Sequence, residues 1–212
     1  DRYGVALVGG DTSRGTLAVT VTVIGKLPRS GGMLRSGARP GDGIWVTGTL
    51  GDAALGLKRW QSKGDRPLSG DSALLAAQLF RPEPRLAAGR VLRDVASAAI
   101  DLSDGVAVDL SRLLEESGVG ATLVLDDLPS SEAYIAERGD LSTMLYGGDD
   151  YELGFCASSL SAELVEVLSK QAGTRLTRIG TVESTPGLRG VDSAGNVCVL
   201  QDDGYDHFAG GS

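Results

Sequence analysis

Two periods alternate in the hydrophobic pattern of the chain, one typical of strands and one typical of helices. Short runs rich in Val, Ile, Thr and Leu predict strands at 5–8, 16–27, 44–47, 98–100, 121–125, 151–157, 175–182, 188–191 and 197–200. Apolar residues three and four positions apart predict helices at 52–60, 72–79, 85–95, 106–114, 131–138 and 161–172. Because the two kinds of element interleave, the pattern favours an α/β fold arranged as an α+β sandwich.

Proline and glycine interrupt this pattern at 28–32, which has the composition of a turn or linker. We place a domain boundary there, with a short domain at 1–27 and a larger one at 28–212. The chain begins at Asp1 rather than at Met, and its first ten residues already have the pattern of a buried strand. We therefore expect the numbered chain to be the C-terminal part of a longer protein.

The stretch 98–114 holds the densest group of reactive side chains. An apolar strand leads to Asp101, Ser103 and Asp104, and a helical pattern begins directly after Gly105. Ser103 or Asp104 is well placed as the N-cap of that helix. Phosphate oxygens bind the free N–H groups of a helix start, and Mg²⁺ commonly combines one or two carboxylates with substrate phosphates. Two interpretations remain open, a Mg²⁺–phosphate site and the plain capping of a helix.

Two more acidic glycine turns lie beside predicted strands. Gly10 and Asp11 follow the first apolar run, and residues 147–150 read Gly-Gly-Asp-Asp before the strand at 151–157. Glycine lets the backbone approach a ligand closely, and aspartate can hold a metal ion. Two adjacent carboxylates repel each other unless they are solvated or share a cation. Each turn is therefore either a ligand-binding corner or an ordinary solvated turn.

Composition narrows the range of functions. The 212 residues are 42% hydrophobic, which supports a buried core, and the net charge of −8 disfavours nucleic acid as a partner. No apolar run approaches the roughly 20 residues of a membrane span. No signal peptide is visible either, so we expect a cytoplasmic protein without a membrane partner. Cys156 and Cys198 match no zinc or disulfide pattern, and we expect both to be buried.

The remaining candidates depend on single residues. Arg35 and Arg39 lie in a glycine-rich loop before the strand at 44–47, where a guanidinium can bind phosphate oxygens or stay solvated. His207 is the one histidine and has no nucleophile motif beside it, which disfavours acyl transfer. Neither a Walker A loop nor a dinucleotide fingerprint follows a strand. If phosphate is bound, we expect aspartate, Mg²⁺ and glycine to hold it.

Six motifs occur in an order that resembles the thiamine-monophosphate kinase family. They are VGGDT (8–12), LRSGARPGD (34–42), VTGTLGDA (46–53), IDLSDG (100–105), YGGDDYEL (146–153) and GYDHF (204–208). That family belongs to the superfamily of aminoimidazole ribonucleotide synthetase and selenophosphate synthetase. The resemblance spans essentially the whole chain. It implies a PurM-like C-terminal domain at 28–212 and, at 1–27, a remnant of the N-terminal domain that binds ATP and Mg²⁺ and forms a dimer interface.

The resemblance implies an ATP-dependent transfer of the γ-phosphoryl group onto thiamine monophosphate, which gives thiamine diphosphate. Carried over residue by residue, the family's ATP contacts fall on Gly10, Asp11, Arg35 and Ser103. No catalytic general base is expected, because the acceptor is a phosphate oxygen that is already ionised at neutral pH. We expect direct transfer without a phosphorylated enzyme.

The resemblance also implies a metal and a substrate contact. The family's Mg²⁺ ligands fall on Asp11, Asp101 and Asp104, and its thiamine contacts fall on Asp149 and Tyr205. Asp149 stands where the family has Glu, so its side chain is one methylene shorter.

Family members carry further aspartates upstream of the region that this chain covers. We therefore expect the chain by itself to be inactive or very weak, and the full-length protein to be a homodimer. Two alternatives stay open. The chain could belong to another ATP-dependent PurM-like synthetase, or it could be a non-catalytic fragment that keeps the fold and serves as an interaction domain.

Overall fold

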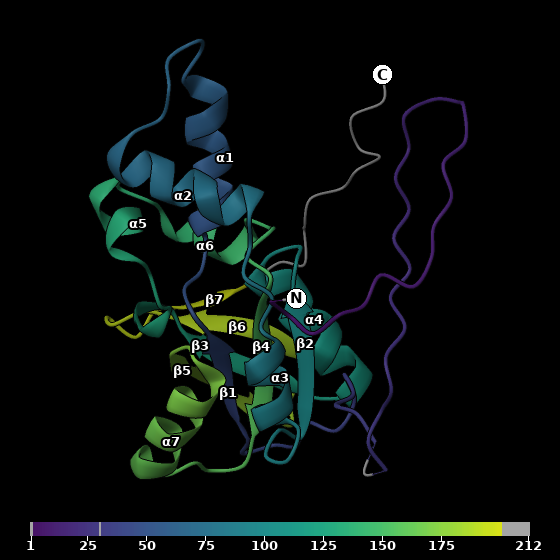
Figure 1. Ribbon diagram of the computed structural model, residues 1–212. Coiled ribbons are helices and arrows are strands. Elements are labelled where there is room, and N and C mark those ends of the chain that lie inside the picture. Colours follow the sequence, from purple (N-terminus) through teal and green to yellow (C-terminus); the bar gives the residue numbers. More distant parts are fainter. Residues whose placement is uncertain (1, 30, 201–212) are drawn as a thin grey trace. The chain divides into compact units, whose positions relative to one another are not determined.

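The structure is a computed structural model that describes residues 2–29 and 31–200 (Figure 1). Contacts between Cα atoms divide the chain into two units, Asp1–Gly32 and Met33–Ser212. Each unit is a separate body. The assignment of residues 1–27 to a domain with a function of its own stays a prediction.

The first unit contains no helix or strand among its described residues. The strands predicted at 5–8 and 16–27 are therefore wrong for this structure. Their apolar side chains are exposed, with Leu7 at 96% and Leu17 at 93%. A strand is stable when a neighbour pairs its N–H and C=O groups and covers its apolar face. No strand among the described residues pairs with this segment.

The second unit is built on one seven-stranded sheet within the described part of the chain. In chain order the strands are β1 (Gly43–Thr47), β2 (Ala98–Leu102), β3 (Gly120–Val124), β4 (Glu152–Ala157), β5 (Leu176–Glu183), β6 (Gly187–Val191) and β7 (Val197–Val199). Across the sheet the order is β2-β4-β1-β5-β3-β6-β7. Neighbours are antiparallel, except that β3 and β6 are parallel. β1 therefore lies inside the sheet, between strands that come more than a hundred residues later.

Helices cover both faces of this sheet (Figure 1). In the described residues they are α1 (Asp52–Ser62), α2 (Gly70–Phe80), α3 (Leu86–Leu92), α4 (Val106–Ser117), α5 (Glu132–Ala136), α6 (Leu141–Tyr146) and α7 (Ala162–Ala172), with a 3₁₀ turn, η1, at Leu125–Asp127. α3 and α7 pack on the face where Trp45 and Phe155 stack with 6.3 Å between ring centroids. α4 packs on the other face through the fully buried Leu110 and Leu113.

α1 and α2 pack against each other and lie with α5 and α6 at one end of the sheet (Figure 1). The two helices approach closely at Gly56, where a Cβ atom would lie only 2.5 Å from the carbonyl oxygen of Leu75. Glycine is therefore required at this crossing. The group of four helices places the N-terminus of α1 beside the acidic turn described below.

The mixed α/β class is confirmed, and every strand predicted between 44 and 200 is present within two residues of its expected ends. α6 was not predicted, because six residues are too few to display a helical period. The helix predicted at 85–95 is shorter, since α3 ends at Leu92.

The two cysteines differ from each other. Cys156 is fully buried in β4, and burial raises its pKa to about 12. Cys198 is exposed, so the prediction of its burial is wrong. It lies in β7, the last strand of the sheet, where all three residues are exposed.

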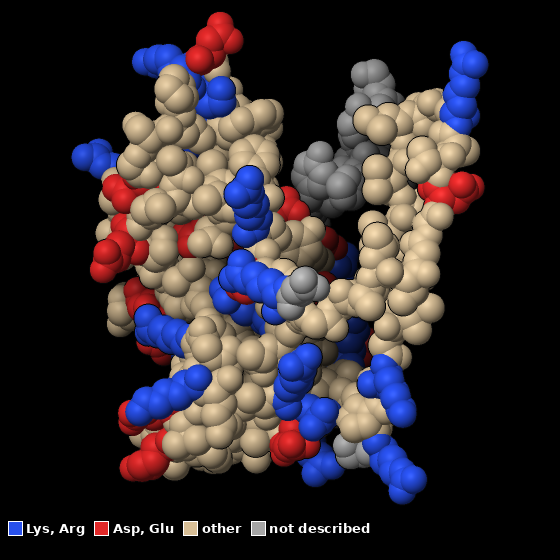
Figure 2. Space-filling model, in the orientation of Figure 1, with Lys and Arg blue, Asp and Glu red and all other residues tan. Residues whose placement is uncertain are grey.

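Basic and acidic side chains are interspersed on the face of the molecule shown in Figure 2. Exposed ion pairs such as that of Lys170 with Glu166, at 2.7 Å, contribute about 0–1 kcal/mol each. In the part of the chain that the structure describes, every helix is too short or too polar to cross a membrane.

Candidate functional site

The centre of the candidate site is the segment that connects β2 to α4. Asp101 is exposed in β2, and Ser103 and Asp104 follow the strand as partly buried residues. The predicted N-cap role of Ser103 or Asp104 is wrong, because the N-cap of α4 is Gly105, at φ 116°, without a side-chain cap. A carboxylate inside the helix instead binds the backbone that precedes it.

That carboxylate belongs to Asp109, which is buried in α4. It accepts the backbone N–H groups of Ser103 at 2.8 Å and of Asp104 at 2.9 Å. Burial raises the pKa of Asp109, whereas these two hydrogen bonds lower it. Arg112, one turn further along α4, pairs with Asp109 at 3.0 Å and also with the carboxylate of Asp104. The carboxylate of Asp109 thus fixes the peptide groups of Ser103 and Asp104. These two residues lie directly before the N-terminus of α4.

The second acidic turn, 147–151, packs directly on this segment. The N–H of Asp149 donates to the carbonyl oxygen of Ser103 at 2.9 Å, and the N–H of Tyr151 donates to that of Leu102 at 2.8 Å. Gly148 allows the close approach, because a Cβ atom there would lie 2.5 Å from the Ser103 oxygen. The structure therefore joins two acidic motifs that are more than forty residues apart in the sequence.

Asp149 and Tyr151 both have left-handed backbone angles, with φ of 69° and 50°. For residues other than glycine this conformation costs of order 1–3 kcal/mol, and it is found most often at functional sites. The Tyr151 hydroxyl donates to Asp149 Oδ1 at 3.3 Å. Burial raises the pKa of Tyr151, and the nearby carboxylates of Asp149, Asp101 and Asp104 raise it further. The charges of all three carboxylates therefore act on this phenol.

Asp150, between them, faces the opposite way. Its two carboxylate oxygens accept the N–H of Gly51, the N-cap of α1, at 3.1 and 2.9 Å. Burial raises the pKa of Asp150 to about 8, and the charges of Asp52 and Glu152 act in the same direction. This partly buried carboxyl is therefore directed to the start of α1.

A buried polar network supports the turn from below. Both carboxylate oxygens of Glu152, the first residue of β4, accept hydrogen bonds from the guanidinium of Arg85, and the distance from Arg85 Nε to Glu152 Oε2 is 2.6 Å. Glu152 also accepts a hydrogen bond from the hydroxyl of Thr47. The bond to Glu152 raises the pKa of Arg85. Gly48 leaves room for this carboxylate, because its Cβ would lie 2.0 Å from Glu152 Oε1. The network joins β1, β4 and the start of α3 under the acidic turn.

The structure brings together four of the residues predicted from the sequence. They are Asp101, Ser103, Asp104 and Asp149. It does not place Arg35 with them, because the Arg35 carbonyl accepts the hydroxyl of Ser117, at the far end of α4. The 12 residues of that helix extend about 18 Å, and the side chain of Arg35 is exposed.

The other predicted residues lie elsewhere in the chain. Gly10 and Asp11 belong to the first unit, where both are exposed and Asp11 Oδ1 accepts the N–H of Thr12 at 2.8 Å. Tyr205 and His207 lie outside the described residues. The predicted roles of all these residues stay predictions.

The donor atoms of the site are hard oxygens. Among residues 2–29 and 31–200, no group of three or more Asp, Glu, His or Cys side chains is arranged to hold a metal ion. Mg²⁺ is commonly held by one or two carboxylates together with substrate phosphates and water. Asp101 and Asp104 are the carboxylates at this position that such a shared ion would use.

Sequence reasoning missed Asp109, Asp150 and Tyr151. One signal pointed to Asp109, because an acid within the apolar run 106–110 is buried unless the helix is broken, and a buried acid needs donors. Nothing in the sequence predicts that Asp150 and Asp149 have different roles, since the residues they bond to lie far away in the sequence.

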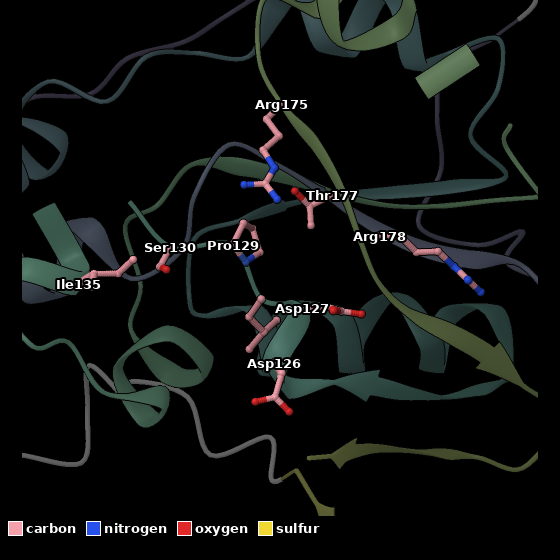
Figure 3. Close-up of a pocket in the computed structure, with 9 residues that line it drawn as sticks. Asp126, Asp127, Pro129, Ser130, Ile135, Arg175, Thr177 and Arg178 are labelled. Atoms are coloured by element: carbon pink, nitrogen blue, oxygen red, sulfur yellow. The ribbon is translucent and has the colours of Figure 1, made fainter. Parts of the chain in front are cut away.

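The pocket drawn in Figure 3 has a volume of about 500 Å³ and adjoins the turn after β1. Two backbone hydrogen bonds join this turn to residues that line the pocket. The N–H of Gly48 donates to the carbonyl oxygen of Arg175, and the N–H of Leu50 donates to that of Pro129, both at 2.9 Å. In Figure 3 the side chain of Arg175 extends toward Pro129, and Arg178 points away. None of the residues predicted from the sequence lines this pocket.

Three comparisons relate the chain to known proteins. Residues 39–193 match the family model described as AIR synthase related protein, C-terminal domain. The thiamine-monophosphate kinase of Salmonella typhimurium is 42% identical over 211 residues, which cover 98% of this chain and 65% of that protein. The chain thus spans slightly less than two thirds of the length of this relative.

Two solved structures are similar to this one. The thiamine-monophosphate kinase of Stenotrophomonas maltophilia K279a superposes with a TM-score of 0.70 at 38% identity, over 74% of this chain and 52% of that one. AaThiL complexed with AMPPCP and TMP superposes with a TM-score of 0.69 at 28% identity, over 83% of this chain and 54% of that one.

Proposed function

Because the chain belongs to the family of AIR synthase related proteins, whose C-terminal domain it carries, we propose that it forms part of an ATP-dependent kinase that acts on thiamine monophosphate. In this reaction the bond between the γ-phosphorus and the bridging oxygen of ATP breaks. A bond to a phosphate oxygen of thiamine monophosphate forms, which gives ADP and thiamine diphosphate. The Salmonella relative, named thiamine-monophosphate kinase, and AaThiL, which is complexed with AMPPCP and TMP, support this choice of substrates.

One observation carries the proposal. The backbone bond from Asp149 to Ser103 places the turn 147–151 against the end of β2. Two motifs expected to bind the two substrates of a kinase therefore share one surface.

The residues of this surface have separate tasks in the proposed reaction. Ser103 and Asp104 lie on the nucleotide side, at the N-terminus of α4, and Arg112 holds the Asp104 carboxylate in place. Asp149 lies on the side of the acceptor. Phosphoryl transfer depends on positioning and charge neutralisation and needs little covalent chemistry from the protein. Direct transfer inverts the configuration at a chiral γ-phosphate, and retention would contradict it.

Asp101 and Asp104 would hold Mg²⁺ in this proposal. When bound, the ion lowers the repulsion between the phosphates of the two substrates. The carboxylates themselves keep the site acidic, so that an uncomplexed phosphate is repelled. We expect Gly10, Asp11 and Tyr205 to complete the substrate contacts, as the sequence predicts, and we keep Arg35 as a predicted ATP contact that lies apart from this group of residues.

A turnover assay of the complete protein that carries this chain tests the proposal. With ATP, Mg²⁺ and thiamine monophosphate, we expect thiamine diphosphate and ADP to form in equal amounts. Asp101→Asn and Asp104→Asn are each expected to lower kcat by roughly a hundredfold. Asp126→Asn and Asp127→Asn, beside the pocket of Figure 3, make the same change of charge and are expected to leave the rate unchanged. Absence of thiamine diphosphate, or an equal loss in the controls, would refute the proposal.

Another ATP-dependent synthetase of the same family is the second candidate, because the matching family model is named for AIR synthase and not for a kinase. A thermal-shift screen separates the two. Thiamine monophosphate raises the melting temperature if the first proposal is right. Stabilisation by aminoimidazole-ribonucleotide precursors alone would favour the second.

The homodimer and the cytoplasmic location also belong to this proposal. Sedimentation of the complete protein at micromolar concentration tests the first, and fractionation of cells tests the second.

A further inference from the structure

We propose that Asp150 is a positioning residue, which holds the carboxylate of Asp149 and the phenol of Tyr151 over the end of β2 without contacting a substrate itself. The inference rests on the function proposed above. It assigns a role to a carboxylate that the proposed reaction does not otherwise use.

The geometry of three consecutive residues supports this role. The side chains of Asp149 and Tyr151 meet at 3.3 Å on one side of the turn. The side chain of Asp150 leaves on the other side and accepts the N–H of Gly51 with both oxygens, at 2.9 and 3.1 Å. The turn therefore presents two side chains to the candidate site and uses the one between them as an anchor.

The anchor is needed because the turn is strained. Asp149 and Tyr151 have positive φ angles, and such a conformation persists only where the surroundings fix it from several sides. Two backbone bonds, to Ser103 and Leu102, tie the turn to β2. The carboxyl group of Asp150 supplies a third bond in a different direction, to the N-cap of α1.

The point of attachment is itself rigid. Gly51 has a φ angle of 81°, and a Cβ atom there would lie 2.9 Å from the ring of Tyr134 and 3.1 Å from the Cα of Met144. The next residue, Asp52, is buried and accepts the hydroxyls of Thr49 and Ser131, each at 2.7 Å. The start of α1 cannot shift easily, so Asp150 fixes the turn relative to the helical end of the domain.

Two substitutions test the proposal in the complete protein. Asp150→Ala removes the acceptor, and we expect the KM for thiamine monophosphate to rise roughly tenfold while kcat and the KM for ATP change by less than about twofold. Asp150→Asn keeps an oxygen that can accept the Gly51 N–H, and it is expected to restore the KM.

Ser161→Ala is the matched control. The Ser161 hydroxyl accepts the N–H of Leu164 at 3.2 Å at the N-terminus of α7, so its loss also removes a side-chain anchor at a helix start. We expect this variant to be less stable, with an unchanged KM. A KM that stays within about twofold in Asp150→Ala, or that rises equally in Ser161→Ala, overturns the proposal.

A second measurement does not depend on activity. Amide hydrogen exchange at Asp149 and Tyr151 is expected to accelerate in Asp150→Ala but not in Ser161→Ala. Unchanged exchange overturns the positioning role even if the kinase is active. If exchange accelerates but no variant forms thiamine diphosphate, the proposed function fails while the anchor stands.

Discussion

Asp150 gives the fold a dependence on pH that one substitution removes. In the unfolded chain this carboxyl ionises near its ordinary pKa of 3.8, whereas burial raises its pKa in the folded protein to about 8. Between these values the unfolded state binds fewer protons than the folded state. The stability from the protonated carboxyl is therefore fully present below about pH 4 and is lost as the pH rises toward 8.

The magnitude follows from the two pKa values. Each pH unit in this window lowers the free energy of unfolding by about 1.36 kcal/mol, so the interval from pH 5.5 to 7.5 lowers it by about 2.5 kcal/mol. Asn has nearly the same shape, keeps an oxygen for the Gly51 N–H and has no proton to lose. The stability of Asp150→Asn relative to the parent chain is thus expected to increase by about 2.5 kcal/mol over this interval.

Urea unfolding at pH 5.5, 6.5 and 7.5, followed by tryptophan fluorescence and circular dichroism, measures this difference. Asp149→Asn is the control, because it makes the same chemical change one residue away and leaves the bond to Gly51 intact. The reasoning is refuted if the difference between Asp150→Asn and the parent chain is the same at all three pH values.

Three further substitutions test the packing around the site, each by urea or thermal unfolding. Arg85→Met leaves the buried Glu152 carboxylate without its cation and is expected to lower the free energy of unfolding by about 3–5 kcal/mol. A second change, Glu152→Gln, removes the uncompensated charge and is expected to restore most of this loss. Asp109→Ala leaves two peptide N–H groups without an acceptor, and each is expected to lower the free energy of unfolding by about 1–3 kcal/mol. Asp109→Asn keeps an acceptor oxygen and is expected to lower it by less. Gly48→Ala is expected to lower stability by more than about 1 kcal/mol beyond Gly64→Ala, since both glycines have φ near 60° but only Gly48 faces a carboxylate. Equal losses in the two alanine variants would contradict the last prediction.

Most elements of the second unit could be predicted because their apolar pattern is local. β1, β4 and α7, for example, show their periods within a few residues, and their ends lie within two residues of the predicted ones. The strand predicted at 16–27 fails for the opposite reason. Its residue types suit a strand, but a strand also needs a neighbour, and no residue in the described part of the chain pairs with it.

The capping of α4 shows a second limit of local patterns. Ser103 and Asp104 are favoured N-cap residues and stand in the right place, yet the structure satisfies their N–H groups with the carboxylate of Asp109. This acceptor, five or six residues further along the chain, fixes the peptide groups that precede the helix and not the N–H groups of its first turn. The prediction identified the right junction, but the N-cap of α4 is Gly105, and Arg112 holds the carboxylate of Asp104.

Asp149 and Asp150 are adjacent and chemically identical, but the fold separates their roles. What distinguishes them is Gly51, 99 positions away, which can bond to only one of the two carboxylates. The positive φ of Asp149 turns its side chain to the candidate site while Asp150 points inward. Asp adopts this backbone conformation more readily than Glu does, because its short side chain can bond locally. The short side chain of Asp149 therefore suits the strained turn.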